Sequence, residues 1–223
     1  VFHGCGHDGH TTMLLGAARH LAQTRNFAGE VVLIFQPAEE GAGGAKRMMD
    51  EGLFEKCPME AVFGMYNWPG PPAGTMGVVA GPMMASSNEF ELVIQGKGSH
   101  AAMPHLSTDP VMVAVQIAQS WQTIISRNTN PQDAGVLSVT QIHSGSATNI
   151  IPDSATMIGT VRTFTMEVLD LIERRMDEIA QHTAAAFGAA TDFSFRRNYP
   201  PLINHEQETA FARAIMQDVV GKE

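Results

Sequence analysis

Apolar residues in the first third of the chain alternate between helical spacing and short continuous runs. After Gly9, the positions of Leu14, Ala17 and Leu21 predict a helix with one apolar face. The runs GEVVLIFQP and MEAVFGMY are apolar and rich in β-branched residues, a pattern typical of strands buried on both faces. A glycine-rich turn and a predicted helix from Lys46 to Glu51 lie between them. This order predicts an α/β layer with a parallel sheet.

The pattern changes after Pro82, where apolar and polar residues begin to alternate as in half-exposed antiparallel strands. Two longer segments repeat apolar residues at helical spacing. The resulting order, strand–helix–strand–strand–helix–strand, predicts a two-layer sandwich of the ferredoxin type. We therefore expect an incomplete catalytic α/β domain at 1–82, an inserted domain at 83–198, and a return to the first domain at 199–223. The predicted strands are 88–98, 135–145, 154–164 and 191–200, and the predicted helices are 109–128 and 166–188.

Composition restricts the possible partners and the compartment. The chain is 44% hydrophobic and 17% charged, which is typical of a globular protein. A net charge of −9 and a pI near 5.4 argue against nucleic-acid or anionic-membrane partners. Only Cys5 and Cys57 occur, so we expect a reducing cytoplasm. The chain starts with Val1 and its last residues follow an amphipathic helix pattern, so we also expect an internal fragment of a longer protein.

Cys5 and His7 lie one residue apart in a glycine-flanked loop. A thiolate and an imidazole at this spacing can reach one borderline cation such as zinc. A polar loop with a buried thiol is the commoner explanation of such a pair. Both interpretations stay open on this motif alone.

Glu39 and Glu40 follow the first apolar run, and the carboxyl ends of parallel strands are where α/β proteins place their sites. Adjacent carboxylates repel each other unless a cation or a shared proton compensates. One glutamate could bind a metal while the other accepts a proton from metal-bound water. A solvated loop with an acidic helix start is equally consistent with the sequence, because negative charge is favourable at a helix N-terminus.

Three polar residues of the second predicted domain are further candidates. His100, in GKGSHAAMPH, follows a glycine turn directly after a strand, which predicts an exposed imidazole. Asn149 lies in the loop SATNIIPD, and Arg162 lies on a strand of otherwise small and apolar residues. Arg162 is either an ordinary exposed strand residue or a bidentate partner for a carboxylate. Taken singly, each has an ordinary structural explanation.

Together, six segments resemble the M20 metallopeptidase family, in the amidohydrolase branch of hippurate hydrolases, N-acyl-amino-acid amidohydrolases and auxin-conjugate hydrolases. They occur in the family's order and cover essentially the whole chain. The segments are GCGHDGHTTMLLGAA, FQPAEEGAGGAKRM, FGMYNWPG, GKGSHAAMPH, TNIIPD and GTVRTF.

The resemblance implies a parallel-sheet catalytic domain with a two-metal site and an inserted α+β ferredoxin-like lid that mediates dimerisation. By motif position, Cys5, His7 and Glu40 resemble metal ligands, and Glu39 resembles the general base. The mixed ligand set is compatible with zinc, manganese, cobalt or nickel. The implied fold class is therefore α/β, with two divalent ions as cofactors.

The lid motifs imply the remaining roles. His100 resembles the lid histidine that reaches the partner subunit's active site and stabilises the oxyanion. Asn149 and Arg162 resemble the pair that holds the substrate's amide oxygen and free carboxylate. The implied reaction is hydrolysis of a small N-acyl amino acid by a homodimer, giving a carboxylic acid and an amino acid.

Two departures from the family pattern leave a second interpretation open. Tyr66 stands where the family has a histidine ligand, and a neutral phenol binds divalent zinc or manganese poorly. The family's last metal-binding histidine belongs to a C-terminal portion outside this chain, and His205 lies too early to replace it. The alternative is a non-catalytic relative or fragment that dimerises and binds small carboxylates.

Overall fold

The computed structural model describes residues 5–221, which form two compact units. Unit 1 comprises residues up to Gly77 together with the segment from Phe211 onward, and unit 2 comprises Val78–Ala210. The first division lies close to the expected domain boundary at 82/83. The second lies further along the chain than the expected boundary at 198/199.

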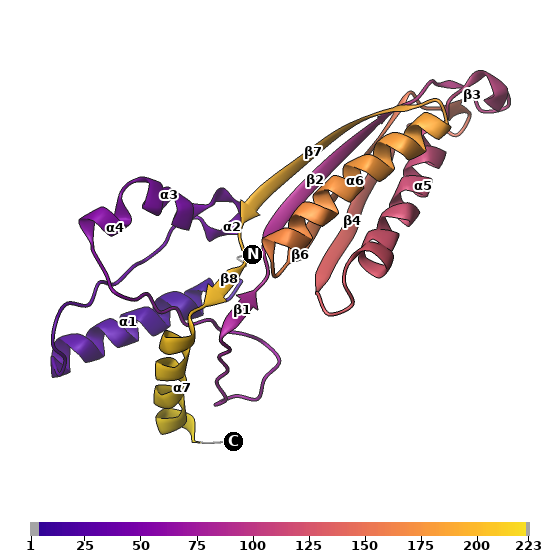
Figure 1. Cartoon of the computed structure of the whole chain (residues 1–223). Coiled ribbons are helices and arrows are strands. Elements are labelled where there is room, and N and C mark those ends of the chain that lie inside the picture. Colours follow the sequence, from indigo (N-terminus) through magenta and orange to yellow (C-terminus); the bar gives the residue numbers. More distant parts are fainter. Residues whose placement is uncertain (1–4, 222–223) are drawn as a thin grey trace. The chain divides into compact units, whose positions relative to one another are not determined.

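Unit 2 is a four-stranded antiparallel sheet covered on one face by two helices (Figure 1). The strand order is β4-β6-β2-β7, and the structure confirms the six predicted elements in their predicted order. They are β2 (Ser87–Gln95), α5 (Pro110–Thr123), β4 (Gly135–Ser144), β6 (Ser154–Thr163), α6 (Met166–Ala186) and β7 (Ala190–Tyr199).

The core of unit 2 forms because alternate strand residues face the two helices. Phe90, Leu92 and Ile94 of β2 are buried, whereas Glu91 and Val93 between them are not. Apolar residues from α5 and α6 close this core, with Trp121 at its centre. Its ring packs edge-to-face on Phe90 at 5.1 Å, and its Nε1–H donates to the backbone oxygen of Met176 at 3.0 Å.

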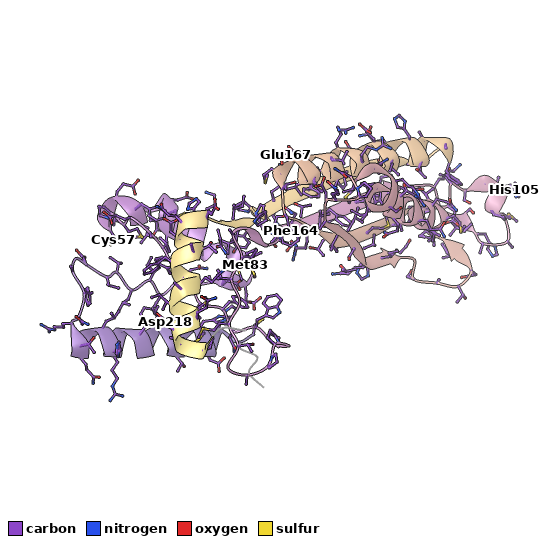
Figure 2. The ribbon with its side chains drawn as sticks, turned by 60° about the horizontal axis from the view of Figure 1, so that its bottom comes forward. Cys57, Met83, His105, Phe164, Glu167 and Asp218 are labelled. Atoms are coloured by element: carbon purple, nitrogen blue, oxygen red, sulfur yellow. The ribbon has the colours of Figure 1, made fainter. Side chains whose placement is uncertain are left out.

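Two small ladders extend unit 2. Strand β1 (Gly81–Met84) pairs with β8 (Leu202–Asn204), and β3 (Ser99–His100) pairs with β5 (Ile150–Ile151), all antiparallel. A 3₁₀ turn, η1 (Pro104–Leu106), follows β3, and a π-helical turn, η2 (Ile124–Asn128), extends α5. Figure 2 places His105 of η1 at the end of unit 2 away from Phe164 and Glu167.

Unit 1 contains four helices joined by extended segments, and the long helix α7 crosses from unit 2 into unit 1. The predicted helices after Gly9 and around Lys46 are confirmed as α1 and α3. The bounds are α1 (His7–Thr24), α2 (Glu39–Ala42), α3 (Gly44–Asp50), α4 (Leu53–Lys56) and α7 (Glu206–Val220).

The parallel sheet predicted for the first domain is not formed by the described residues. The segments 30–38 and 61–67 carry no strand assignment, and Phe35 and Val62 on them are exposed. An apolar, β-branched run shows that a segment suits a sheet interior, but a strand also needs a hydrogen-bonded neighbour. Neither segment has such a neighbour among residues 5–221. Within the same range, no helix combines the length and apolarity required to cross a membrane.

Candidate metal centre

Two strained turns of unit 1 carry the candidate ligands. Cys5 and Ala38 both adopt left-handed backbone conformations, with φ of 49° and 50°, which is uncommon for residues other than glycine. Cys5 lies in the turn before α1, and Ala38 directly precedes the two glutamates at the start of α2. Such outliers persist where the surroundings hold them in place, and they concentrate at functional sites.

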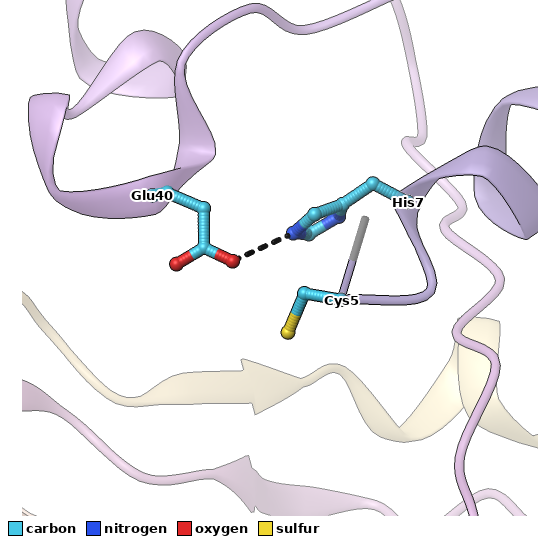
Figure 3. Close-up of side chains that lie close together, drawn as sticks. All are labelled: Cys5, His7 and Glu40. Atoms are coloured by element: carbon cyan, nitrogen blue, oxygen red, sulfur yellow. Dashed lines mark ion pairs between the residues drawn. The ribbon is translucent and has the colours of Figure 1, made fainter. Parts of the chain in front are cut away.

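The structure brings Cys5, His7 and Glu40 together, as Figure 3 shows. One ligand atom from each residue lies within 4.8 Å of the others. Glu39 joins the group, because its Oε2 lies 3.2 Å from Nε2 of His7, while Oε1 of Glu40 lies 3.4 Å from the same nitrogen. The four residues predicted for the metal centre therefore occupy one place.

The His7 ring offers a direct test of whether a cation fits. Its Nε2 is buried and makes no hydrogen bond with any described residue, although two carboxylate oxygens lie within 3.4 Å. The two carboxylate oxygens are therefore close to this nitrogen without forming hydrogen bonds to it. A buried nitrogen beside a thiol and two carboxylates is a donor set that suits zinc or a similar ion. The residues present fit a divalent cation.

His10 supports the His7 ring and was missed by the sequence interpretation. Nδ1 of His10 lies 3.2 Å from Nδ1 of His7, and the backbone N–H of Asn67 donates to Nε2 of His10 at 3.0 Å. The contact on Nδ1 fixes the orientation of the His7 ring. The sequence contained one signal for this contact, because His7 and His10 are three residues apart and positions i and i+3 share one face of a helix.

Negative charge dominates the site. A hydrogen bond with Glu40, and then the negative charge of Glu40, raise the pKa of the Cys5 thiol. The thiol is therefore protonated at neutral pH, and a bound cation would favour the thiolate instead.

Tyr66 lies beside the same cluster. Burial raises the pKa of its phenol, and so do the charge of Cys5, which is a thiolate in the alkaline range where a phenol titrates, and the charges of Glu39 and Glu40. Its ring contacts His10, with ring centroids 4.5 Å apart. A neutral phenol is a hydrogen-bonding group in this site rather than an anionic ligand.

His100 and Asn149 meet at one end of unit 2. His100 pairs with Ile150 across the β3–β5 ladder, and the backbone N–H of Ala101 donates to the backbone oxygen of Asn149 at 2.9 Å. The N–H of Ala102 donates to Nδ1 of His100 at 3.1 Å. Neutral His100 therefore carries its proton on Nε2, which makes that nitrogen a hydrogen-bond donor.

Arg162 lies near the opposite end of unit 2 from Asn149. Strand β6 runs from Ser154 to Thr163, so Arg162 is roughly 26 Å beyond the first residue of that strand. Its Nη1 donates to the backbone oxygens of Asn88 and Val161, at 3.3 and 3.2 Å. Within unit 2 of one chain, Arg162 and Asn149 do not converge on one small molecule.

The whole chain, residues 1–223, matches the model of peptidase family M20/M25/M40. The chain belongs to this family. It is 40% identical over 214 residues to the N-acetyl-L-cysteine deacetylase of Bacillus subtilis, covering 96% of this chain and 51% of that protein. It is 39% identical over 222 residues to the hippurate hydrolase of Campylobacter jejuni, covering 100% of this chain and 58% of that protein. The M20 chain therefore spans about half the length of these curated relatives.

A solved structure of an M20 family member agrees with the fold. The crystal structure of a dinuclear metal-binding peptidase from Bacillus subtilis matches with a TM-score of 0.77 at 36% identity. The match covers 96% of this chain and 54% of that one. The mixed α/β class with a sheet and helices is thereby confirmed, and the relative is described as a dinuclear metal-binding peptidase.

Proposed function

We propose that this M20 protein is a metal-dependent amidohydrolase that cleaves N-acyl amino acids of the hippurate type into a carboxylic acid and an amino acid. The convergence of Cys5, His7 and Glu40, with Glu39 beside them, carries the proposal. The names of the relatives, a deacetylase of N-acetyl-L-cysteine and a hippurate hydrolase, support the substrate class. The ion is zinc, manganese, cobalt or nickel, and the family implies two.

The proposed chemistry divides among the clustered residues. Cys5, His7 and Glu40 would hold a divalent cation, which when bound polarises the scissile carbonyl and makes water more acidic. Glu39 is assigned a different role. Its carboxylate lies beside His7, but it is not one of the three candidate ligands, Cys5, His7 and Glu40. It accepts the proton of the attacking water and delivers it to the leaving amine.

Unit 2 would supply substrate recognition. Nε2–H of His100 donates a hydrogen bond to the oxyanion that develops on the carbonyl. Asn149 holds the amide oxygen, and the guanidinium of Arg162 binds the free carboxylate with two parallel hydrogen bonds. Selection of amino-acid conjugates over simple amides follows from this carboxylate contact.

The separation of Asn149 from Arg162 supports a site shared by two copies. Both residues are assigned to one substrate only a few bonds long, yet they lie near opposite ends of a unit within one chain. In this proposal, residues 83–198 form a ferredoxin-like lid that dimerises. His100 and Asn149 of one copy then act with Arg162 of the other.

Tyr66 favours a second candidate, a dimerising protein that binds small carboxylates without turnover. Its phenol is neutral and stands where the family has a histidine, so it supplies no anionic ligand for a second ion. The two candidates differ in metal content and in turnover.

Hippurate hydrolysis by the full-length protein distinguishes them. After reconstitution with each of the four ions, we expect benzoate release that falls about 10²- to 10⁴-fold in Glu39→Gln, the range for loss of a general base. Glu55→Gln, on the exposed surface of α4, is the matched control and should behave as wild type. Well under one metal per chain together with no benzoate release would overturn the enzyme proposal and favour the carboxylate-binding candidate.

A further inference from the structure

Asp153 occupies the junction between the main sheet of unit 2 and the small sheet that carries His100. Its backbone oxygen accepts from the N–H of Gly96 at 2.8 Å, directly after the β2–β6 ladder ends at Gln95 and Ser154. Its side-chain Oδ1 accepts from the N–H of Gly98 at 2.8 Å, directly before the β3–β5 ladder begins at Ser99 and Ile151. One residue therefore ends one ladder and starts the next.

The side chain of Asp153 makes a hydrogen bond just beyond the last backbone pair of the small ladder. Ser99 is paired with Ile151, so the residue after Ile151 in this antiparallel register is Pro152, which has no N–H. The carboxylate of Asp153 accepts from Gly98 at this point and extends the pairing by one residue. Asp153 thus supplies an acceptor for the N–H of Gly98, one residue before the β3–β5 ladder begins.

Gly98 fits the carboxylate closely. A Cβ atom at this position would lie 2.7 Å from the backbone oxygen of Ile151 and 3.0 Å from Oδ1 of Asp153. On the other side of the loop, Lys97 is bridged to Thr108 by two backbone hydrogen bonds of 2.9 and 3.0 Å. The segment from Gly96 to His100 is consequently held between two chain segments, and Asp153 contributes a side-chain hydrogen bond to it.

We infer that Asp153 is a positioning residue, which holds β3 against β5 so that His100 and Asn149 act on the same substrate. The inference rests on the proposed function, because it assigns Asp153 an effect on turnover through His100. Asp153 contacts no reacting atom in this account. Its carboxylate sets the orientation of a two-stranded ladder, and that ladder determines where Nε2–H of His100 points.

Three variants of the full-length protein test the link to turnover. With hippurate as substrate, Asp153→Ala should lower kcat about 10- to 100-fold while KM changes less than about threefold, as expected for a misplaced catalytic group. Asp153→Asn keeps an acceptor oxygen and should restore kcat to within about threefold of wild type. Asp192→Ala, an exposed aspartate on β7, is the control and should leave both parameters unchanged.

A double variant and an exchange measurement separate this inference from the proposed function. In a His100→Ala background, Asp153→Ala should add no further loss, because both changes remove the same interaction. Independently of any activity, amide hydrogen exchange at Gly98 should accelerate at least about tenfold in Asp153→Ala and stay near wild type in Asp153→Asn.

The outcomes are distinct. An inactive wild-type protein overturns the proposed function, and the structural part of the inference is then decided by exchange at Gly98 alone. Unchanged exchange in Asp153→Ala overturns that part. If the wild-type enzyme is active, an unchanged kcat in Asp153→Ala overturns the proposal that Asp153 acts through His100. The same conclusion follows if Asp153→Ala lowers kcat as much in the His100→Ala background as in the wild-type background.

Discussion

The two units of this M20 chain differ in what holds them together. Every apolar residue of the buried core lies in unit 2, between Phe90 and Ala184. Among the described residues of unit 1, only Gly44 is buried. Unit 1 instead exposes apolar side chains on its two extended segments, namely Val31, Leu33, Phe35, Val62, Phe63 and Met65.

The candidate chemistry is concentrated in the unit without a core. The metal ligands are held by left-handed turns at Cys5 and Ala38 and by the His10–Asn67 contact. Unit 2 holds its groups on hydrogen-bonded ladders. We therefore expect substitutions in the core of unit 2 to change the free energy of unfolding. Substitutions in the turns of unit 1 should change the affinity for metal.

The two tryptophans test this contrast most strongly. Trp121 is fully buried in unit 2, whereas Trp68 of unit 1 is 60% exposed. Trp121→Ala should lower the free energy of unfolding by about 3–5 kcal/mol, because it leaves a large cavity and removes the hydrogen bond from Nε1–H to the backbone oxygen of Met176. Trp68→Ala should cost less than about 1 kcal/mol. Urea denaturation measures both, and equal losses would contradict the difference between the units.

A pair of glycines tests whether the turns of unit 1 control metal binding. A Cβ on Gly44 would lie 1.6 Å from the backbone oxygen of Pro37, so Gly44→Ala must displace the loop that carries Glu39 and Glu40. We expect at least about a tenfold loss of zinc affinity, the lower range for disturbed ligand support, with the unfolding of unit 2 unchanged. Gly16 of α1 has no atom within 4 Å of such a Cβ and is the matched control. Retention of wild-type affinity in Gly44→Ala would show that the loop geometry is unimportant.

Tyr66 tests how many ions unit 1 holds. Tyr66→His replaces a neutral phenol with a nitrogen ligand, and elemental analysis should show a rise in bound metal toward one further ion per chain. Tyr66→Phe, which removes only the hydroxyl, should leave the metal content as in wild type. Equal metal content in all three proteins would mean that position 66 is not a ligand site.

The smallest expected effect belongs to a surface ion pair of unit 2. Hydrogen bonds from Arg175 and Arg174 lower the pKa of Glu178 in the folded state. Its contribution to stability is therefore present above the unfolded pKa and is lost as pH falls through the lowered folded pKa. Urea denaturation of Glu178→Gln should show a small loss at pH 7 that disappears in acid. A loss that persists at low pH would contradict this ion-pair account.

The same contrast explains how much the sequence could predict. Alternation and helical spacing predicted the six main elements of unit 2, because its four long strands pair with one another, but they did not predict the short strands β1, β3, β5 and β8. They failed for the apolar runs of unit 1, since periodicity carries no information about whether a neighbouring strand is present. Family resemblance grouped Cys5, His7, Glu39 and Glu40, and the structure places these side chains near one another. The residue roles and the metals depend on contacts with substrate, ions and partner chains, so they stay predictions, as does the cytoplasmic location.

The central claim, a metal centre that includes Cys5, is tested most directly by cobalt spectroscopy. Cobalt(II) bound by a thiolate shows a charge-transfer band in the near ultraviolet, and the chain contains only two cysteines to supply that thiolate. We predict that the cobalt-loaded full-length protein shows this band, that Cys5→Ser abolishes it, and that Cys57→Ser leaves it intact. A band that survives in Cys5→Ser, or is lost in Cys57→Ser, would contradict the account.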